Sequence, residues 1–103
     1  MDNIHMDNKT ETLVILMEEC GEVIQECSKI LRFGNSSERM YLIKLHKELG
    51  DLLCMIRMTE SNLGLDMNDT QQYSHDKWVK LKQWSNISSG SSKQRSFGSE
   101  EVE

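Results

Sequence analysis

The sequence predicts an all-α fold, an antiparallel bundle of about three long helices with a flexible C-terminal tail. Apolar residues recur at alternating steps of three and four over much of the chain, which is the period of one helix face. The 103 residues include six glycines and no proline, which leaves few turn residues for a β-barrel or a sandwich. A chain of this length also favours one domain over two.

The first helix is expected from about Thr10 to Leu31. Gly34 follows it, where a left-handed C-cap is expected because glycine adopts a positive φ without steric cost. Ser36 or Ser37 can then cap the next helix, since a serine hydroxyl accepts from a free N–H of the first turn. So short a connection predicts antiparallel neighbours. The apolar seam of the first helix advances by 3, 4, 3, 4 and 3 residues, through Leu13, Leu16, Cys20, Val23, Cys27 and Ile30.

The second helix is expected from about Glu38 to Ser61, with Gly64 in its C-cap region. A third, more polar helix is expected to start at Asp66 or Asn68 and to run to Trp84. The seam of the second helix repeats the steps of the first, through Leu42, Leu45, Leu49, Leu52 and Ile56.

The composition changes at residue 85. Seven of the last 19 residues are serine and two are glycine, so this stretch has too little apolar surface to offset its loss of conformational entropy on ordering. The sequence therefore predicts a structured domain over residues 1–84 and a flexible tail over residues 85–103.

The formal charge of -5 arises from 17 acidic and 12 basic residues, and residues 1–34 alone hold seven acids and three bases. Such a balance disfavours nucleic acid as a partner, because neutralising phosphates needs a basic surface. The longest apolar run, Leu13 to Met17, is far shorter than the about 20 residues of a membrane span. The first residues lack the charged and apolar regions of a secretory signal, and the cysteine count of three is odd. We therefore expect a cytoplasmic protein with reduced thiols and no membrane partner.

Two short segments carry the same pattern of acid, apolar residue, glycine, acid and apolar residue. They are Glu19-Cys20-Gly21-Glu22-Val23 in the first expected helix and Glu48-Leu49-Gly50-Asp51-Leu52 in the second. In both, the acids directly precede two successive seam positions. Acids at i and i+3 share a helix face, so each helix presents a pair of carboxylates beside its buried seam. If the two helices pack antiparallel, all four carboxylates can converge.

This pattern is unfavourable for a helix with a purely structural role. Neighbouring like charges destabilise a helix by a few tenths of a kcal/mol, and each interior glycine costs about 1 kcal/mol relative to alanine. A small residue would let two helix backbones approach, and a bound cation would turn carboxylate repulsion into ligation. Several carboxylate oxygens suit Mg²⁺ or Mn²⁺. The alternative is a solvated acidic face, which is the usual explanation of a single acid pair.

The segment Glu18-Glu19-Cys20-Gly21-Glu22, followed after 25 residues by Glu48-Leu49-Gly50-Asp51, resembles the EExxE and ExxD signature of the all-α nucleoside triphosphate pyrophosphatases. This is the MazG-like and dimeric dUTPase-like superfamily, and the likeness extends from about Leu13 to Trp84. The resemblance implies a Mg²⁺-dependent enzyme, with Mn²⁺ as a substitute, that converts a nucleoside or deoxynucleoside triphosphate to the monophosphate and pyrophosphate. The sequence lacks the initial helix with a CPWD-type segment found in longer members.

The resemblance also implies roles for single residues. Glu19, Glu22, Glu48 and Asp51 match the positions that ligate Mg²⁺ in the family. Either Glu19 or Glu22 would act as general base on the attacking water.

The family often uses basic residues of its last helix to contact the triphosphate. Lys77 and Lys80 share a helix face in the only net-positive part of the chain, so they are the candidates for substrate binding. A solvated basic face is the alternative explanation of these lysines.

The apolar residues outside the two seams predict a second copy as partner, because three helices of this length cannot cover them all. Members of the family form dimers and tetramers, which implies a homodimer or homotetramer here. These off-seam residues are Val14, Met40, Ile43, Met55 and Met58.

Two alternative functions remain at this stage. The first is phosphoribosyl-ATP pyrophosphohydrolase, an enzyme of similar size and fold, although the form of the segment from Glu48 to Asp51 favours the MazG-like group. The second is a non-catalytic helical interaction module whose acids bind a structural cation or a basic partner.

Overall fold

The computed structural model describes residues 7–87, apart from the side chains of residues 34–38. This part of the chain forms two helices, α1 (Asn8–Leu63) and α2 (Met67–Trp84), and it includes no strand. The prediction of an all-α fold is therefore confirmed. Within residues 7–87, no helix has the length and apolarity that crossing a bilayer requires. Of the predicted C-terminal tail, residues 88–103 lie outside the described residues.

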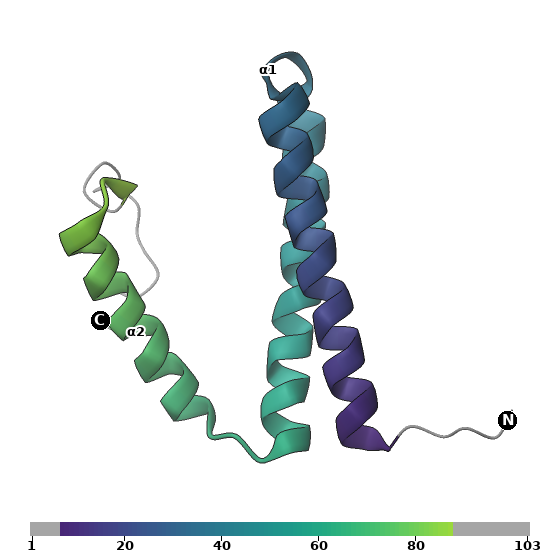
Figure 1. Cartoon of the computed structure of the whole chain (residues 1–103), viewed down its shortest axis with the longest axis vertical. Helices are drawn as coiled ribbons and strands as arrows, with labels where there is room; N and C mark the ends of the chain where they lie inside the picture. Colours follow the sequence, from purple (N-terminus) through teal and green to yellow (C-terminus); the bar gives the residue numbers. More distant parts are fainter. Residues whose placement is uncertain (1–6, 88–103) are drawn as a thin grey trace, which may run out of the picture. The chain divides into compact units, whose positions relative to one another are not determined.

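Helix α1 is folded back on itself, so that its two arms, residues 8–33 and 39–63, lie side by side and antiparallel (Figure 1). At the open end, the Asn62 amide donates a hydrogen bond of 2.9 Å to the Thr12 hydroxyl, 50 residues away in the chain. At the other end, the rings of Phe33 and Tyr41 stack with their centroids 6.1 Å apart. With α2, the two arms make up the three helical segments that the sequence predicts.

The ends of α1 follow the local chemistry of the sequence. Asp7 is the N-cap, and its carboxylate accepts a hydrogen bond of 2.8 Å from the backbone N–H of Thr10. Gly64 is the C-cap, with a φ of 72° that glycine adopts most easily, and its N–H donates to the carbonyl of Glu60. The predicted caps at Gly34 and at Ser36 or Ser37 lie outside the residues whose side chains are described.

The two arms face each other through a mixed apolar and polar set of side chains, which we call the inner face. Each arm contributes positions at alternating steps of four and three, and all of them are buried or half-buried. The set comprises Thr12, Leu16, Glu19, Val23, Glu26 and Ile30 from the first arm, and Tyr41, Leu45, Glu48, Leu52, Met55, Thr59 and Asn62 from the second. Three acids therefore lie between the arms instead of beside them.

The predicted seam is wrong at alternate positions. Leu13 is 42% exposed, Leu42 48% and Leu49 45%, and Cys20 and Cys27 are also exposed. The physical reason is that α1 has two neighbouring stripes at the same spacing, one mixed and one apolar, and the arms meet through the mixed one. The apolar stripe of the first arm, here called the outer stripe, is solvent-exposed and comprises Leu13, Met17, Cys20, Ile24, Cys27 and Leu31.

Helix α2 belongs to a second unit that begins at Asp66. Asp66 is its N-cap and accepts a hydrogen bond of 2.9 Å from the N–H of Asn68, so the helix starts in the region that the sequence predicts. None of the side chains of α2 is buried. Trp78 is half-buried, with the His75 ring stacked at 6.0 Å and the Lys82 ammonium 4.7 Å from its ring centre. Helix α2 thus offers a largely polar, exposed surface.

Candidate metal centre

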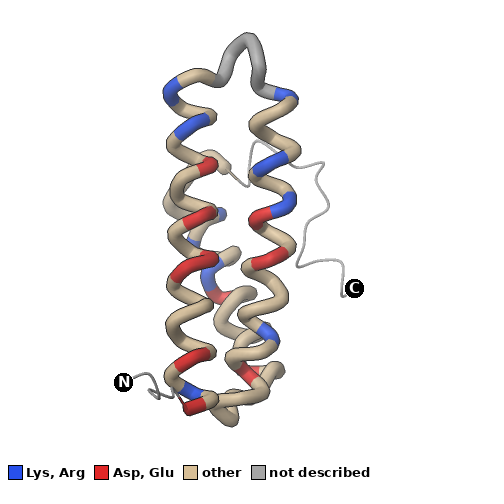
Figure 2. Tube along the Cα trace, turned by 90° about the vertical axis from the view of Figure 1, so that its right-hand side faces the viewer, with Lys and Arg blue, Asp and Glu red and all other residues tan. Residues whose placement is uncertain are grey.

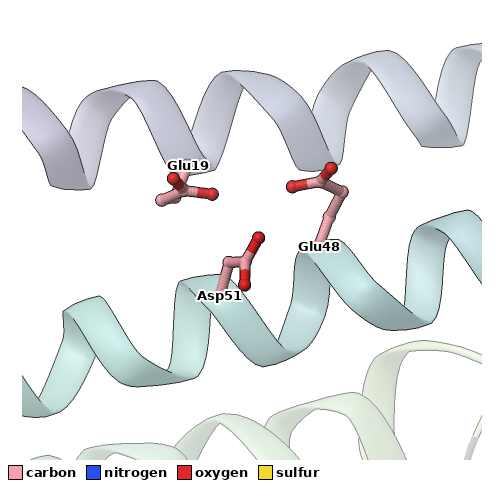
Figure 3. Close-up of side chains that lie close together, drawn as sticks. All are labelled: Glu19, Glu48 and Asp51. Carbon is pink, nitrogen blue, oxygen red and sulfur yellow. The ribbon is translucent and has the colours of Figure 1, made fainter.

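Three carboxylates from the two arms of α1 form one group. Glu19 extends from the first arm, and Glu48 and Asp51 extend from the second toward it (Figure 3). One carboxylate oxygen from each residue lies within 4.8 Å of the others. Oxygens at this separation can bind the same divalent cation after small side-chain movements.

The helical spacing and the antiparallel packing produce this group together. Glu48 and Asp51 are three residues apart, so they lie on the same side of the second arm. Glu19 lies on the inner face of the first arm and meets them across the hairpin. Residues distant in sequence therefore form one cluster without any loop contributing to it.

The negative charges of the group disfavour one another. Partial burial raises the pKa of Glu19 above its usual value, and the charges of Asp51 and Glu22 raise it further. Partial burial also raises the pKa of Glu48, together with the charges of Glu22 and Asp51. The Oε1 atom of Glu19 is buried and has no hydrogen-bond partner. An unsatisfied carboxylate oxygen among other acids fits a hard cation such as Mg²⁺.

The two glycines between the acids do not bring the arms closer together. A Cβ atom built on Gly21 or Gly50 would meet nothing within 4 Å. The expectation that these glycines allow a close approach of the two helix backbones is therefore wrong for the hairpin itself. Side chains of the inner face, which are larger than glycine, set the separation of the arms instead.

Charge changes sign along the hairpin. Acidic positions lie along the middle of both arms, and basic positions concentrate toward the end where the arms are joined (Figure 2). In the sequence, five basic residues lie between Glu26 and Glu48, namely Lys29, Arg32, Arg39, Lys44 and Lys47. The carboxylate group thus lies next to a region that attracts anions.

Comparison with known proteins decides the family. The family model described as the MazG nucleotide pyrophosphohydrolase domain matches residues 7–84, which include both α1 and α2. The chain belongs to the MazG nucleotide pyrophosphohydrolase family. No curated protein and no solved structure matches the chain. The resemblance drawn from the sequence motif is therefore confirmed.

Glu22, the fourth of the predicted metal ligands, is outside the three-carboxylate group. Its side chain is exposed, while Glu19 and Glu48 are half-buried. Its charge nevertheless contributes to the raised pKa values of Glu19 and Glu48, so it acts on both of them. Glu22 thus borders the group and remains open to solvent.

The lysines predicted to bind substrate lie in the second unit of the MazG domain. Lys77 and Lys80 are exposed on α2 and are three residues apart, so they share a side of that helix. Lys82 points elsewhere, because its ammonium lies over the Trp78 ring. The pair is therefore available to an anion in solution.

Sequence reasoning missed one acid of the inner face. Glu26 is 7% exposed, and it lies outside the MazG motif, four residues after Glu22. A signal was present, because Glu26 follows Glu19 by seven residues and therefore lies on the same side of the helix. The apolar seam obscured this signal, since it favours the neighbouring stripe.

Proposed function

We propose that the protein is a Mg²⁺-dependent nucleoside triphosphate pyrophosphohydrolase, which converts a nucleoside or deoxynucleoside triphosphate and water to the monophosphate and pyrophosphate. Mn²⁺ would substitute for Mg²⁺, since both prefer oxygen ligands. The observation that carries the proposal is the approach of carboxylate oxygens from Glu19, Glu48 and Asp51 within 4.8 Å in a chain of the MazG family.

The residues of the group suit a divalent cation. Glu19, Glu48 and Asp51 would hold it, with Glu22 moving in as a fourth ligand or remaining at the border. When bound, the cation would neutralise charge on the phosphoryl oxygens and lower the pKa of a water molecule. The carboxylates would fix the position of the cation, because they come from two packed helices instead of a loop.

Glu22 is the better candidate for the general base. Glu19 belongs to the carboxylate group and its Oε1 atom is buried, whereas the Glu22 side chain is exposed. The Glu22 carboxylate would take a proton from the attacking water as the new bond to the α-phosphorus forms. The bond from that phosphorus to the bridging oxygen would break, and pyrophosphate would leave with its electron pair.

The basic residues would hold the phosphates. Lys77 and Lys80 are exposed on one side of α2 and would contact the triphosphate as charged donors. The basic region beside the carboxylates would attract the same anion over a longer range.

A second copy of the chain would complete the assembly as a homodimer or a homotetramer. The outer stripe is exposed along the whole first arm, and none of the described apolar side chains is buried in the single chain. An apolar surface of this extent is typical of an interface. The stripe would pack against its equivalent in the partner.

The first test measures pyrophosphate release from each common ribo- and deoxyribonucleoside triphosphate, and from phosphoribosyl-ATP, with Mg²⁺ and with a chelator. Glu22→Gln should lower kcat about 100-fold or more, because the general base is lost. Asp51→Asn should raise the Mg²⁺ concentration needed for half-maximal rate, because one ligand charge is lost.

Glu60→Gln is the matched control, since Glu60 is another shielded acid of the second arm and is outside the carboxylate group. It should leave the rate within about twofold of the original, as expected for a site away from the chemistry. Circular dichroism should show that all three variants are folded. Release from no nucleotide would favour the non-catalytic helical module, and full activity in Glu22→Gln and Asp51→Asn would refute the site.

A further inference from the structure

The open end of the hairpin is joined by a polar contact between the arms. The Asn62 side-chain amide donates a hydrogen bond of 2.9 Å to the Thr12 hydroxyl, and that hydroxyl donates one of 2.7 Å to the carbonyl of Asn8. Thr12 is 5% exposed, and Asn62 is half-buried. Because a shielded polar group that loses its partner is costly, this bond favours the packing of the arms in which both groups are satisfied.

A second packing of the same two arms is available to the sequence. The outer stripe is the inner face of the first arm displaced by one residue, so that Leu13 follows Thr12, and each later position repeats this relation. In the second arm, the exposed side chains of Leu42, Leu49 and Leu53 also follow inner-face positions by one residue. One residue corresponds to about 100° around a helix. Turning each arm by this angle would therefore bring two largely apolar stripes together.

The second packing would disperse the carboxylate group. Burial of apolar surface favours it, whereas the observed packing takes part of the Glu19 and Glu48 side chains out of water. If both arms turned so that the apolar stripes met, Glu19 and Glu48 would leave the inner face. Asp51, which is already exposed, would turn farther from it. The approach of the three carboxylates therefore depends on which sides of the arms meet.

The contact at the open end exists only in the observed packing. In the second packing, Leu13 and Leu63 would take the places of Thr12 and Asn62, and neither leucine side chain can form a hydrogen bond. A polar residue at a helix interface can specify one arrangement at a cost in stability. A second copy covering the outer stripe would favour the same arrangement from outside, whereas this bond acts within one chain.

We infer that Thr12 and Asn62 are positioning residues for the three-carboxylate group, because their bond specifies which sides of the two arms meet. This inference deepens the proposed function and rests on it. Thr12 precedes Glu19 by seven residues, about two turns of helix. It therefore acts on the cation through the orientation of the first arm and not by contact.

The test measures the affinity of the full chain for Mn²⁺ without nucleotide, by the electron paramagnetic resonance of free Mn²⁺. Thr12→Val keeps the shape of the side chain but leaves the Asn62 amide facing a methyl group. Mn²⁺ should bind about 10-fold more weakly, because only the fraction of chains in the observed packing is competent. Thr12→Ser keeps the hydroxyl and should bind Mn²⁺ within about twofold of the original chain.

Thr59→Val is the matched control. Thr59 is 8% exposed on the inner face, and its hydroxyl donates a hydrogen bond of 2.6 Å to the Met55 carbonyl of its own arm. Within the described part of the chain, this hydroxyl makes no bond to the first arm. Thr59→Val therefore loses a bond within its own arm, as Thr12→Val does, but no bond between the arms. It should keep its Mn²⁺ affinity within about twofold.

Asn62→Ala provides a milder variant in case Thr12→Val does not fold. It removes the donor and leaves the Thr12 hydroxyl bonded to Asn8, and it should weaken Mn²⁺ binding in the same direction. Circular dichroism and urea unfolding in a chelator report whether each variant is folded and how stable it is. Addition of Mn²⁺ should raise the urea midpoint of the original chain more than that of Thr12→Val, because tighter binding stabilises more.

The outcomes separate this inference from the proposed function. Unchanged Mn²⁺ affinity in folded Thr12→Val and Asn62→Ala, or an equal loss in Thr59→Val, would overturn the positioning role and leave the three-carboxylate group intact. The expected order of affinities in a chain that releases no pyrophosphate would support the positioning role and refute the enzyme. An original chain that binds no Mn²⁺ would refute both.

Discussion

At the scale of single residues, the carboxylate group combines proximity with partial burial. Glu19 and Glu48 are half-buried, and the pKa of each is raised, first by that burial and then by neighbouring negative charges. The folded chain without a cation therefore holds these protons more tightly than the unfolded chain does. Folding and ionisation of the group oppose each other until a cation binds.

This opposition predicts the pH dependence of stability without metal. Glu19 and Glu48 have ordinary pKa values of 4.5 and raised values in the folded chain. Their contribution to stability is therefore fully present below 4.5 and is lost as pH rises through the raised values. Urea unfolding in a chelator should give a midpoint that falls over this range, and the double variant Glu19→Gln and Glu48→Gln should remove the fall.

Asp7 provides the control of opposite sign. The hydrogen bonds from Thr10 at the N-cap lower its pKa from 3.8, so its contribution is present above that value and is lost as pH falls through the lowered value. Asp7→Asn should change the acid side of the profile and leave the fall at higher pH in place. If the fall at higher pH persisted in the double variant, groups other than Glu19 and Glu48 would cause it.

The residues of the group were largely predictable, because the repeated acid pairs give the motif and the helix period gives the shared face. The burial of Glu19 and Glu26 was not. A spacing of three and four fits two neighbouring stripes of α1, and hydropathy favours the apolar one. Which stripe the arms use to pack against each other depends on what the other stripe packs against in the whole assembly. The sequence of one helix does not specify those contacts.

At the scale of elements, the glycine inside α1, Gly50, and the glycine that caps it, Gly64, occupy positions with different backbone conformations. Gly50 lies inside the second arm, is exposed and has open space where a Cβ would be. Gly64 ends the helix with a φ of 72°. Sequence reasoning predicted the role of Gly64 correctly because a C-cap is a local feature, but it attributed to Gly50 a close contact that the hairpin does not have.

Alanine substitution distinguishes the two positions. Gly50→Ala should stabilise the chain by about 1 kcal/mol, because alanine has the higher helix propensity. Gly64→Ala should destabilise it by about 1–2 kcal/mol, because a Cβ is strained in the left-handed region. Thermal unfolding followed by circular dichroism measures both. A loss of stability in Gly50→Ala would indicate that another chain packs against that position.

Helix α2 carries the prediction about substrate affinity. Lys77→Ala and Lys80→Ala should each raise the KM about 10-fold with little change in kcat, because a charged donor to the phosphates is lost before and during reaction alike. Lys82→Ala is the matched control, since its ammonium lies over the Trp78 ring. Steady-state kinetics with a preferred nucleotide measure the KM of each variant. An equal rise in KM for all three substitutions would indicate long-range electrostatic attraction of the substrate instead of direct contact.

At the scale of the whole molecule, the single chain lacks a buried apolar core among its described residues. Among the side chains that the structure describes, four are buried, and all four are polar or charged: Thr12, Glu26, Thr59 and Glu60. Burial of apolar surface is the main favourable term in folding. We therefore expect a second copy of the chain to cover the exposed apolar side chains. The sequence predicted this need from apolar residues outside its seams, although part of the seam itself belongs to the uncovered surface.

The outer stripe is the place where a second copy should bind. Met17 is 65% exposed, Ile24 68% and Leu31 86%, and all three lie on one side of the first arm. Light scattering should therefore find a dimer or a tetramer at about 10 µM, a concentration at which an interface of nM to µM affinity is occupied. A folded monomer at this concentration would contradict the interface.

Ile24→Glu tests the stripe directly. Burying an isoleucine contributes about 2 kcal/mol, and a twofold interface contains the residue twice, so its replacement by a charge should weaken association on the order of 1000-fold. Gln25→Glu introduces the same charge at the adjacent exposed position, off the stripe, and should leave the assembly intact. Because the hairpin buries no described apolar side chain by itself, the dissociated Ile24→Glu chain should also lose helical signal in circular dichroism. Dissociation into fully helical monomers would mean that the hairpin is stable without its partner.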